Sequence, residues 1–286
     1  MTRPNSPIVS QRRVLAAIRE AREALSLTQR EVAEALDWSV SKIIRIERGS
    51  VGLSITDLKA LLLHYGITDR DRVESYVQLA RAGRQPAWWD DYRRVFKPDF
   101  VRFLGLESAA EMVQQYQFHL IPGLLQTAAY TRSLVRTSGW GQEWAERQVK
   151  VRRMRQARLE DPELGHNFIL DESVLYRRVT EFVHWREQLQ WMLQVSRQSN
   201  VSVRILPYTA GWIDGMQSSF TIMKMSDQVN DIHLSIERPD GDQQFADARG
   251  AEKAVEFGKI FARIEAAALP ASETPSVIEA SLLNRQ

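Results

Sequence analysis

The feature that most constrains the fold is a series of helix caps set close together in the first third of the chain. Thr28, Ser39 and Ser54 each precede an apolar helical pattern, where a side-chain oxygen accepts a backbone N–H of the first turn. Glu31, three residues after Thr28, completes a capping box, and Gly49 favours a helix end. These signals predict five short helices, over residues 10–25, 28–36, 39–48, 54–66 and 69–82.

The connection between the second and third of these helices is only about three residues long. A joint this short forces the two helices to cross steeply, as in a helix-turn-helix unit. In the third helix Ile43 and Ile46 are three residues apart and share a face. We expect them to pack against the second helix and on Leu61 or Leu62. The opposite side of the third helix carries Val40, Ser41, Ile44 and Arg45.

This opposite side has residue types that suit a helix lying in the DNA major groove. Arg45 can donate a bidentate pair of hydrogen bonds to guanine O6 and N7. Val40 and Ile44 cannot hydrogen-bond a base, but either can touch a thymine methyl group. The third helix is therefore a candidate recognition helix.

Contacts to the DNA backbone are predicted at two places. Ser41 and Lys42 suit phosphates on the third helix. Thr28, Gln29 and the free N–H groups at the start of the second helix suit another phosphate. The alternative is an ordinary surface helix with solvated cations, because charge runs are common on exposed faces.

Residues 25–49, LSLTQREVAEALDWSVSKIIRIERG, resemble the Xre/lambda-repressor type of helix-turn-helix domain. The matching features are Leu-Thr-Gln entering the second helix, a serine entering the third, and the closing Arg-Ile-Glu-Arg-Gly. The resemblance implies a sequence-specific DNA-binding regulator. In it, Gln29 would hold the DNA backbone, and Val40, Ser41 and Arg45 would face bases.

The same resemblance implies a buried ion pair between Arg22 and Glu47 that links the first and third helices. The sequence departs from the family at positions 40 and 44, which are usually polar and here are Val and Ile. Readout should then depend on methyl contacts, Arg45 and DNA shape. The predicted DNA-binding residues are Thr28, Gln29, Ser39, Val40, Ser41, Lys42, Ile44 and Arg45.

The remainder of the chain has a mixed pattern of β-branched and helical stretches. It predicts an α/β or α+β domain with about five strands, following a packed linker that contains Trp88 and Trp89. The predicted organisation is a disordered segment 1–9, an all-α domain 10–84, a linker 85–100, an α/β domain 101–270 and a loose tail 271–286. Strands are predicted at 112–116, 167–170, 201–207, 218–225 and 231–237, with a turn at 239–241. Helices are predicted at 127–135, 142–159, 183–196 and 248–269.

Three stretches of this second part resemble the C-terminal domain of actinobacterial regulators of the WhiJ type. They are WWDDY, then residues 103–127, then residues 204–223. The resemblance implies a regulator often encoded beside a small partner protein, in an arrangement likened to toxin–antitoxin pairs. The domain itself is of unknown function in that family, so the resemblance names no ligand.

Within these stretches, IPGLLQT (121–127) could shape a pocket wall and TAGWIDGM (209–216) could be a lid or pocket loop. The alternative for both is tight-turn geometry and core packing. Four aromatic side chains could likewise form a ligand cage, but we expect them in the core or in an interface. These are Trp185, Trp191, Tyr208 and Trp212.

Charge is spread unevenly along the chain. Residues 1–84 carry 14 Lys and Arg against 10 Asp and Glu, and the rest carries 24 against 26. A basic N-terminal part followed by a slightly acidic remainder is typical of a polyanion-binding domain joined to a near-neutral domain. The cations of residues 149–158 scatter around a predicted helix and are expected to be solvated, although contact with flanking phosphates or an acidic partner is the alternative.

The chain has no cysteine, no apolar run long enough to span a membrane and no signal-peptide pattern. We therefore expect a cytoplasmic, nucleoid-associated protein with double-stranded DNA as its partner. Helix-turn-helix proteins usually bind paired half-sites as dimers, so we expect a homodimer. A small partner protein or a small-molecule effector would act on the second domain. No cofactor is predicted.

Enzymatic readings find little support in the sequence, and we expect no catalysis. Common hydrolase, nucleotide-binding and zinc-protease motifs are absent, and the five histidines lie 18 or more residues apart. The one carboxylate set that could form a metal or nuclease site is Asp171, Glu172 and Glu237. Three hypotheses follow: a transcription regulator, an antitoxin-like protein that sequesters a small partner, and a metal-dependent enzyme in the second domain.

Overall fold

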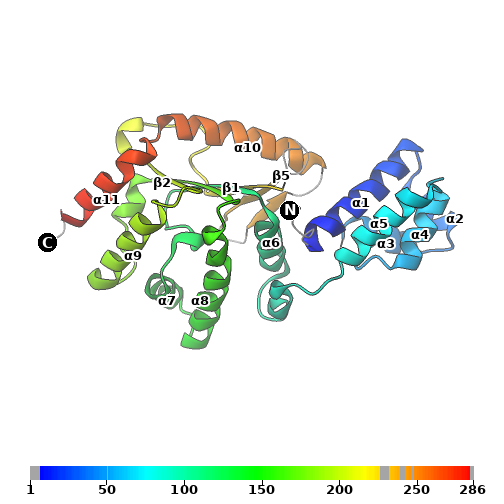
Figure 1. The fold of residues 1–286 in the computed structure, drawn as a ribbon, viewed down its shortest axis with the longest axis horizontal. Helices are drawn as coiled ribbons and strands as arrows, with labels where there is room; N and C mark the ends of the chain where they lie inside the picture. The colour runs from blue at the N-terminus through cyan, green and yellow to red at the C-terminus, as the bar shows by residue number, and fades with distance from the viewer. Residues whose placement is uncertain (1–6, 50, 226–231, 239–241, 246–247, 284–286) are drawn as a thin grey trace. The chain divides into compact units, whose positions relative to one another are not determined.

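The computed structural model describes residues 7–49, 51–225, 232–238, 242–245 and 248–283. The chain divides into two compact units, residues 1–109 and 110–286 (Figure 1). The first is helical and the second is a mixed α/β unit with a six-stranded sheet, which confirms the predicted fold class. Among the described residues, no helix is long and apolar enough to cross a membrane.

The predicted caps start the helices of the N-terminal unit. Thr28, Ser39 and Ser54 each accept a hydrogen bond from a backbone N–H three residues later, and Asp69 does the same for the fifth helix. The helices are α1 (Pro7–Ala24), α2 (Gln29–Ala35), α3 (Val40–Glu47), α4 (Ile55–His64) and α5 (Arg70–Ala82). Their shared core includes Val14, Ile18, Val32, Ala33, Ile43, Ile46, Leu58, Leu61 and Leu62.

The start of the chain differs from the prediction of a disordered segment over residues 1–9. Helix α1 begins at Pro7, because proline is well suited to the first helical position and Val9 is buried. Residues 1–6 of the predicted segment lie outside the described residues.

The predicted linker over 85–100 is instead part of the first unit. It contains a 3-10 helix, η1 (Trp88–Tyr92), and the start of α6 (Pro98–Ala109). Successive ring contacts join Trp88 to Tyr92, Tyr92 to Phe96, and Phe96 to Phe100, which makes the segment a packed one. The division between the two compact units therefore lies after residue 109.

The C-terminal unit is built on one sheet with strand order β3-β2-β1-β4-β5-β6. Strands β1, β2 and β3 are mutually parallel, and β1–β4, β4–β5 and β5–β6 pairs are antiparallel. The short sixth strand was not predicted, and the predicted turn at 239–241 lies outside the described residues. The strands are β1 (Met112–Gln117), β2 (Gly165–Asp171), β3 (Val201–Leu206), β4 (Phe220–Lys224), β5 (Ile232–Ile236) and β6 (Gln243–Phe245).

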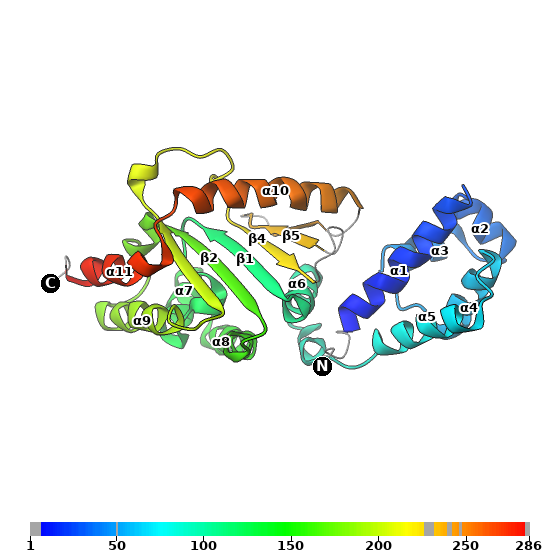
Figure 2. The same ribbon diagram turned by 45° about the horizontal axis from the view of Figure 1, so that its top comes forward.

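Helices cover both faces of the sheet (Figures 1 and 2). Helix α10 packs on one face with Phe220 and Leu234, while α9 and α11 close the other over Phe168 and Val203. The helices are α7 (Ala128–Thr137), α8 (Gln142–Gln156), α9 (Phe182–Val195), α10 (Ala248–Ala267) and α11 (Thr274–Leu283). Short 3-10 turns connect them: η2 (Gly123–Leu125), η3 (Ala157–Glu160), η4 (Glu172–Leu175), η5 (Tyr208–Ala210) and η6 (Ala271–Glu273).

The predicted loose tail over 271–286 is wrong for residues 271–283. This stretch forms η6 and α11 because it has a partner surface: Ile278 is fully buried in the core beneath the parallel strands. The Thr274 hydroxyl also donates a 2.7 Å hydrogen bond to the carbonyl oxygen of Val203 on β3.

Candidate nucleic-acid interface

Helix α3 has two distinct sides. Ile43, Ile46 and Glu47 are buried against the other helices. Val40, at 38% exposure, lies on the outer side with Ser41 and Arg45, while Ile44 is half-buried. Val40, Ser41 and Arg45, which were predicted to face bases, are therefore at the surface, and Ile43 and Ile46, which were predicted to pack, are in the core.

Arg45 is an exposed cation on this outer side. Its Nε donates a 3.3 Å hydrogen bond to the carbonyl oxygen of Ser41, one turn earlier in the same helix. Within the described part of the chain it forms no ion pair. The guanidinium is thus held along α3 and can still donate to a base edge.

Lys42 is placed differently from the prediction that it suits a phosphate. Its Nζ forms a 2.7 Å ion pair with Asp57 of α4 and lies 3.6 Å from the centroid of the Trp38 ring. Burial disfavours the charged form of Asp57, but hydrogen bonds from Lys42 and Ser54 outweigh it and lower the pKa of this carboxyl group. Lys42 therefore joins α3 to α4.

A buried polar network backs the recognition helix. Arg22 on α1 donates to both carboxylate oxygens of Glu47, at 2.7 and 3.1 Å, so the ion pair implied by the family resemblance is present. Gln29 Nε2 donates to the same carboxylate at 2.7 Å, and Arg19 donates to the Glu47 carbonyl oxygen at 2.8 Å. Helices α1, α2 and α3 are thereby tied together, and the Gln29 amide that was predicted to hold DNA points at Glu47.

The start of α2 already holds a carboxylate. Glu31 accepts hydrogen bonds from the backbone N–H and the hydroxyl of Thr28, each at 2.7 Å, and these bonds lower the pKa of Glu31. Its negative charge stands where the prediction places a phosphate. A phosphate can approach Thr28 only at the expense of this capping box.

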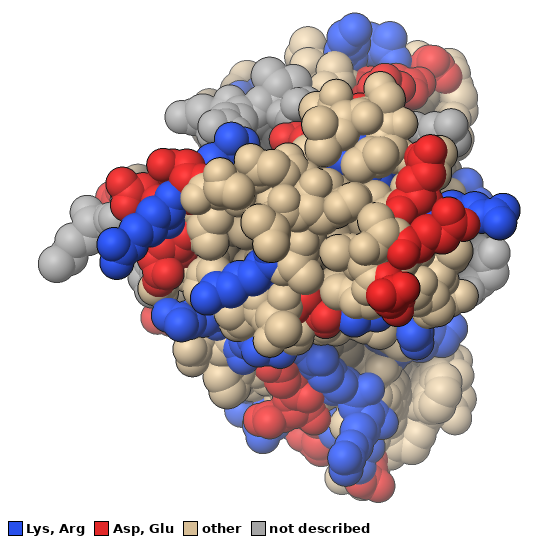
Figure 3. Space-filling model, turned by 90° about the vertical axis from the view of Figure 1, so that its right-hand side faces the viewer, with Lys and Arg blue, Asp and Glu red and all other residues tan. Residues whose placement is uncertain are grey.

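Charges on the face shown in Figure 3 are mixed. Lys and Arg side chains are interspersed there with Asp and Glu side chains, without a single basic field. On α2, Arg30 and Glu34 lie one turn apart and form an exposed 2.9 Å ion pair.

These features define the structural class of the N-terminal unit. A short helix capped by Ser39, backed by a buried network and displaying Val40, Ser41 and Arg45, is the second helix of a helix-turn-helix unit. Residues 14–75 match a helix-turn-helix domain, so the N-terminal unit contains a helix-turn-helix DNA-binding domain.

The larger match covers residues 100–280 and is to a domain of unknown function, DUF5753. The chain belongs to the family of proteins that carry this domain. No curated protein and no solved structure matches the chain.

In the C-terminal unit, the prediction of solvated cations over residues 149–158 is wrong for three arginines. Arg155 and Arg158 are buried, and Arg152 is half-buried. The interior supplies acceptors for them: Arg152 donates to the side chain of Gln126, and Arg158 donates to His166 Nε2 and to the Ala110 carbonyl oxygen.

The IPGLLQT segment packs around these arginines. A Cβ atom at Gly123 would lie 2.9 Å from Nη1 of Arg155, so glycine leaves room for the guanidinium. Leu124 and Leu125 are fully buried in the core. The segment therefore packs in the core, as the alternative interpretation held.

The three carboxylates of the enzyme hypothesis do not share a site. Asp171 accepts from the backbone N–H of Ser173, Glu172 accepts from that of Tyr208, and Glu237 is bonded to Gln117. Two strands separate β2 from β5, which sets Asp171 and Glu237 apart by roughly 14 Å. Among the described residues, no three His, Asp or Glu side chains form a group that could hold a metal ion.

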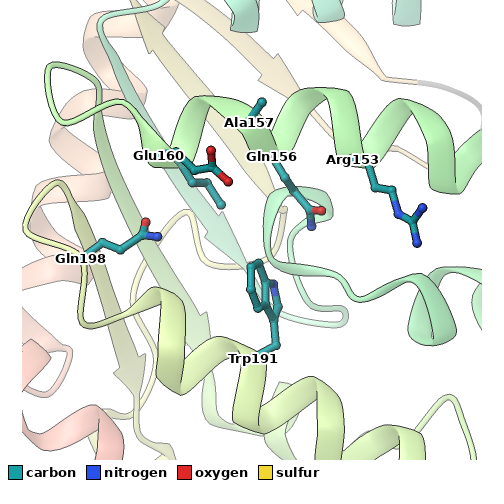
Figure 4. Close-up of a pocket in the computed structure, with 7 residues that line it drawn as sticks. Arg153, Gln156, Ala157, Glu160, Trp191 and Gln198 are labelled. Carbon is teal, nitrogen blue, oxygen red and sulfur yellow. The ribbon is translucent and has the colours of Figure 1, made fainter.

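A pocket of about 210 Å³ lies between α8, η3 and α9 (Figure 4). Trp191, Glu160 and Gln198 converge on it, and Gln156 is fixed beside it by hydrogen bonds to the carbonyl oxygens of Leu124 and Gln126. The volume is smaller than that of most ligand sites. Sequence reasoning did not identify this pocket, because its residues come from separate helices.

Of the four aromatic residues expected in the core or an interface, two are inside. Trp185 is fully buried and Trp191 is packed against the same core. Tyr208 and Trp212 are on the surface, where an interface is the expectation that stays open to them.

Proposed function

We propose that the protein is a sequence-specific transcription regulator that reads operator DNA by inserting α3 into the major groove. The observation that carries the proposal is the outer side of α3, where Val40, Ser41 and Arg45 are exposed on a helix held rigidly from behind. The match of residues 14–75 to a helix-turn-helix domain supports it.

The contacts we propose divide into two kinds. Arg45 donates to a guanine, and Val40 with Ile44 contacts thymine methyl groups, which gives direct readout. Ser39 and Ser41, at the exposed start of α3, contact phosphates that fix its orientation. The Arg22–Glu47 pair contributes indirectly, because it sets the position of α3 against α1.

At the level of the whole protein, we propose a cytoplasmic homodimer that binds a roughly palindromic operator. The C-terminal unit would bind a small partner protein or an effector and so modulate DNA binding. Support for this part is the family resemblance and the presence of a separate, fully packed second unit.

The test is selection of genomic DNA fragments by the purified protein, with Arg45→Ala in parallel. We expect one enriched motif with two symmetric half-sites in the wild type. Loss of the Arg45 contacts should cost about 1–3 kcal/mol of binding free energy per site and relax preference at one base pair.

The matched control is Arg81→Ala, which removes another exposed cation, from α5. It should select the same motif as the wild type. If Arg45→Ala also selects that motif unchanged, the proposed orientation of α3 is wrong. If the wild type enriches no motif, we would look for a co-purifying partner, as the antitoxin-like hypothesis requires.

A further inference from the structure

Three exposed aromatic side chains lie beyond the carboxyl ends of the parallel strands. Tyr176 follows β2 and η4, while Tyr208 and Trp212 follow β3. Their exposures are 38%, 60% and 72%. The rings of Tyr176 and Tyr208 stack with centroids 6.5 Å apart. In open sheets with parallel strands, ligands commonly bind beyond this edge.

The loop that carries Trp212 has a defined structure (Figure 2, the yellow segment above the end of α10). Gly211 and Gly215 adopt φ values of +70° and +98°, which favour glycine. Ile213 and Met216 pack into the core beneath α10. The loop therefore packs its half-buried aliphatic side chains against the core and leaves Trp212 exposed.

Two carboxylates lie beside the stacked tyrosines in fixed positions. One oxygen of Glu172 accepts the backbone N–H of Tyr208 at 2.8 Å, and one oxygen of Asp171 accepts that of Ser173 at 2.9 Å. Within the described part of the chain, the second oxygen of each accepts nothing. Burial, then Asp171 and Glu172, raise the pKa of Tyr208, which places these charges close to its ring. Arg177 is the neighbouring cation and opposes them.

We propose that Tyr176, Tyr208, Trp212, Asp171 and Glu172 form a docking surface for an arginine-bearing segment of a partner protein. Aromatic faces attract cations, and a carboxylate binds a guanidinium through paired hydrogen bonds. A planar guanidinium also stacks on aromatic rings, which an ammonium does not, so arginine fits better than lysine. Exposed tyrosine and tryptophan side chains are frequent centres of protein interfaces.

This inference rests on the proposed function only in assigning partner binding to the C-terminal unit. It names the chemistry of that partner as basic. An acidic segment would be repelled by Asp171 and Glu172, and a purely apolar one would leave their free oxygens desolvated without a donor.

The test uses the full chain labelled with 5-fluorotryptophan and followed by fluorine NMR, without DNA. The probe is the end-blocked peptide Gly-Arg-Gly-Arg-Gly, and the resonance of Trp212 is assigned with Trp212→Phe. We expect a saturable shift of the Trp212 signal. Trp140, which is 59% exposed on another part of the unit, is the internal control and should not move.

Variants separate the two halves of the surface. Asp171→Asn with Glu172→Gln keeps an acceptor oxygen at each position, so the local turns persist, and should weaken peptide binding about fivefold or more. Tyr208→Ala should weaken it similarly. The peptide Gly-Glu-Gly-Glu-Gly should produce no shift.

The proposal is overturned if the arginine peptide leaves the Trp212 signal unchanged, if Trp140 responds equally, or if the glutamate peptide binds as well. Because the titration contains no DNA, each of these results is independent of operator selection. A protein that selects its operator but ignores the peptide would refute this inference alone.

Discussion

At the scale of single residues, the N-terminal unit is organised around one buried carboxylate. The Glu47 carboxylate accepts hydrogen bonds from Arg22 and Gln29, and its negative charge raises the pKa of the Tyr65 phenol. Such a network specifies one arrangement of helices when each member is satisfied. The Tyr65 hydroxyl is the exception, because it is buried and has no hydrogen-bond partner among the described residues.

Tyr65 should make the unit sensitive to alkali. Burial, and then the charge of Glu47, raise the pKa of Tyr65 to about 12, while an unfolded tyrosine ionises near pH 10. The unfolded chain thus loses its proton first, so this contribution to stability is complete below about pH 10 and disappears as the pH approaches 12.

We therefore expect Tyr65→Phe to unfold in urea much as the wild type does at pH 8, or at slightly higher urea, since no hydrogen bond is lost. At pH 11–12 the wild type should lose up to about 2–3 kcal/mol more than the variant. Tyr76→Phe, on α5 of the same unit, is the control. Equal alkaline losses in wild type and Tyr65→Phe would contradict the assignment.

At the scale of elements, the helices of the N-terminal unit could be predicted from their caps, whereas the partners of the charged side chains could not be predicted. A cap is a local pattern, so Thr28, Ser39 and Ser54 could be identified from neighbouring residues alone. Whether a cation is solvated or engaged inside the protein depends on acceptors distant in sequence. Lys42 forms an ion pair with Asp57, and Arg158 donates a hydrogen bond to the Ala110 carbonyl oxygen. Neither partner could be found from the pattern of one helix.

The same reasoning applies to α6 and α11. Each is stabilised by surfaces supplied from elsewhere in the chain, such as the Val203 carbonyl that bonds Thr274. The candidate interface was predictable to the level of which residues are exposed on α3. The engagement of Gln29 by Glu47 was not, because it joins two helices.

The cap of α3 offers a prediction that separates folding from recognition. Ser39→Ala and Ser54→Ala each remove one N-cap and should each cost about 1 kcal/mol of stability. Only Ser39→Ala frays the turn that carries Val40 and Ser41. It should therefore weaken operator binding several-fold at equal folded concentration, measured by fluorescence anisotropy, whereas Ser54→Ala should not. Parallel losses in both variants would show that the α3 cap has no special part in recognition.

At the scale of the whole molecule, a helix of eight residues offers a small reading surface. One α3 can reach only a few base pairs, so specificity over a genome needs a second copy. This is the physical basis for the homodimer in the proposed function. The two units of the chain would then divide the tasks of reading DNA and of receiving a signal.

A dimer makes the spacing of half-sites a measurable constraint. Inserting five base pairs between the half-sites turns one half of the operator to the opposite face of the helix. Binding by the proposed dimer should fall by at least about tenfold, and an insertion of ten base pairs should restore part of it. Affinity that is indifferent to both insertions would mean that each chain binds alone, and light scattering of the free protein gives the independent check.

The ion pair between Lys42 and Asp57 has a further consequence for how the protein moves among binding sites. A cation already neutralised inside the protein releases no condensed counterion from DNA, and the Glu31 carboxylate at the start of α2 adds none. The logarithm of affinity should then fall only shallowly with the logarithm of salt concentration. Weak attraction to arbitrary DNA shortens the time spent on wrong sequences, so the search for an operator would proceed more by dissociation and rebinding than by sliding along the duplex.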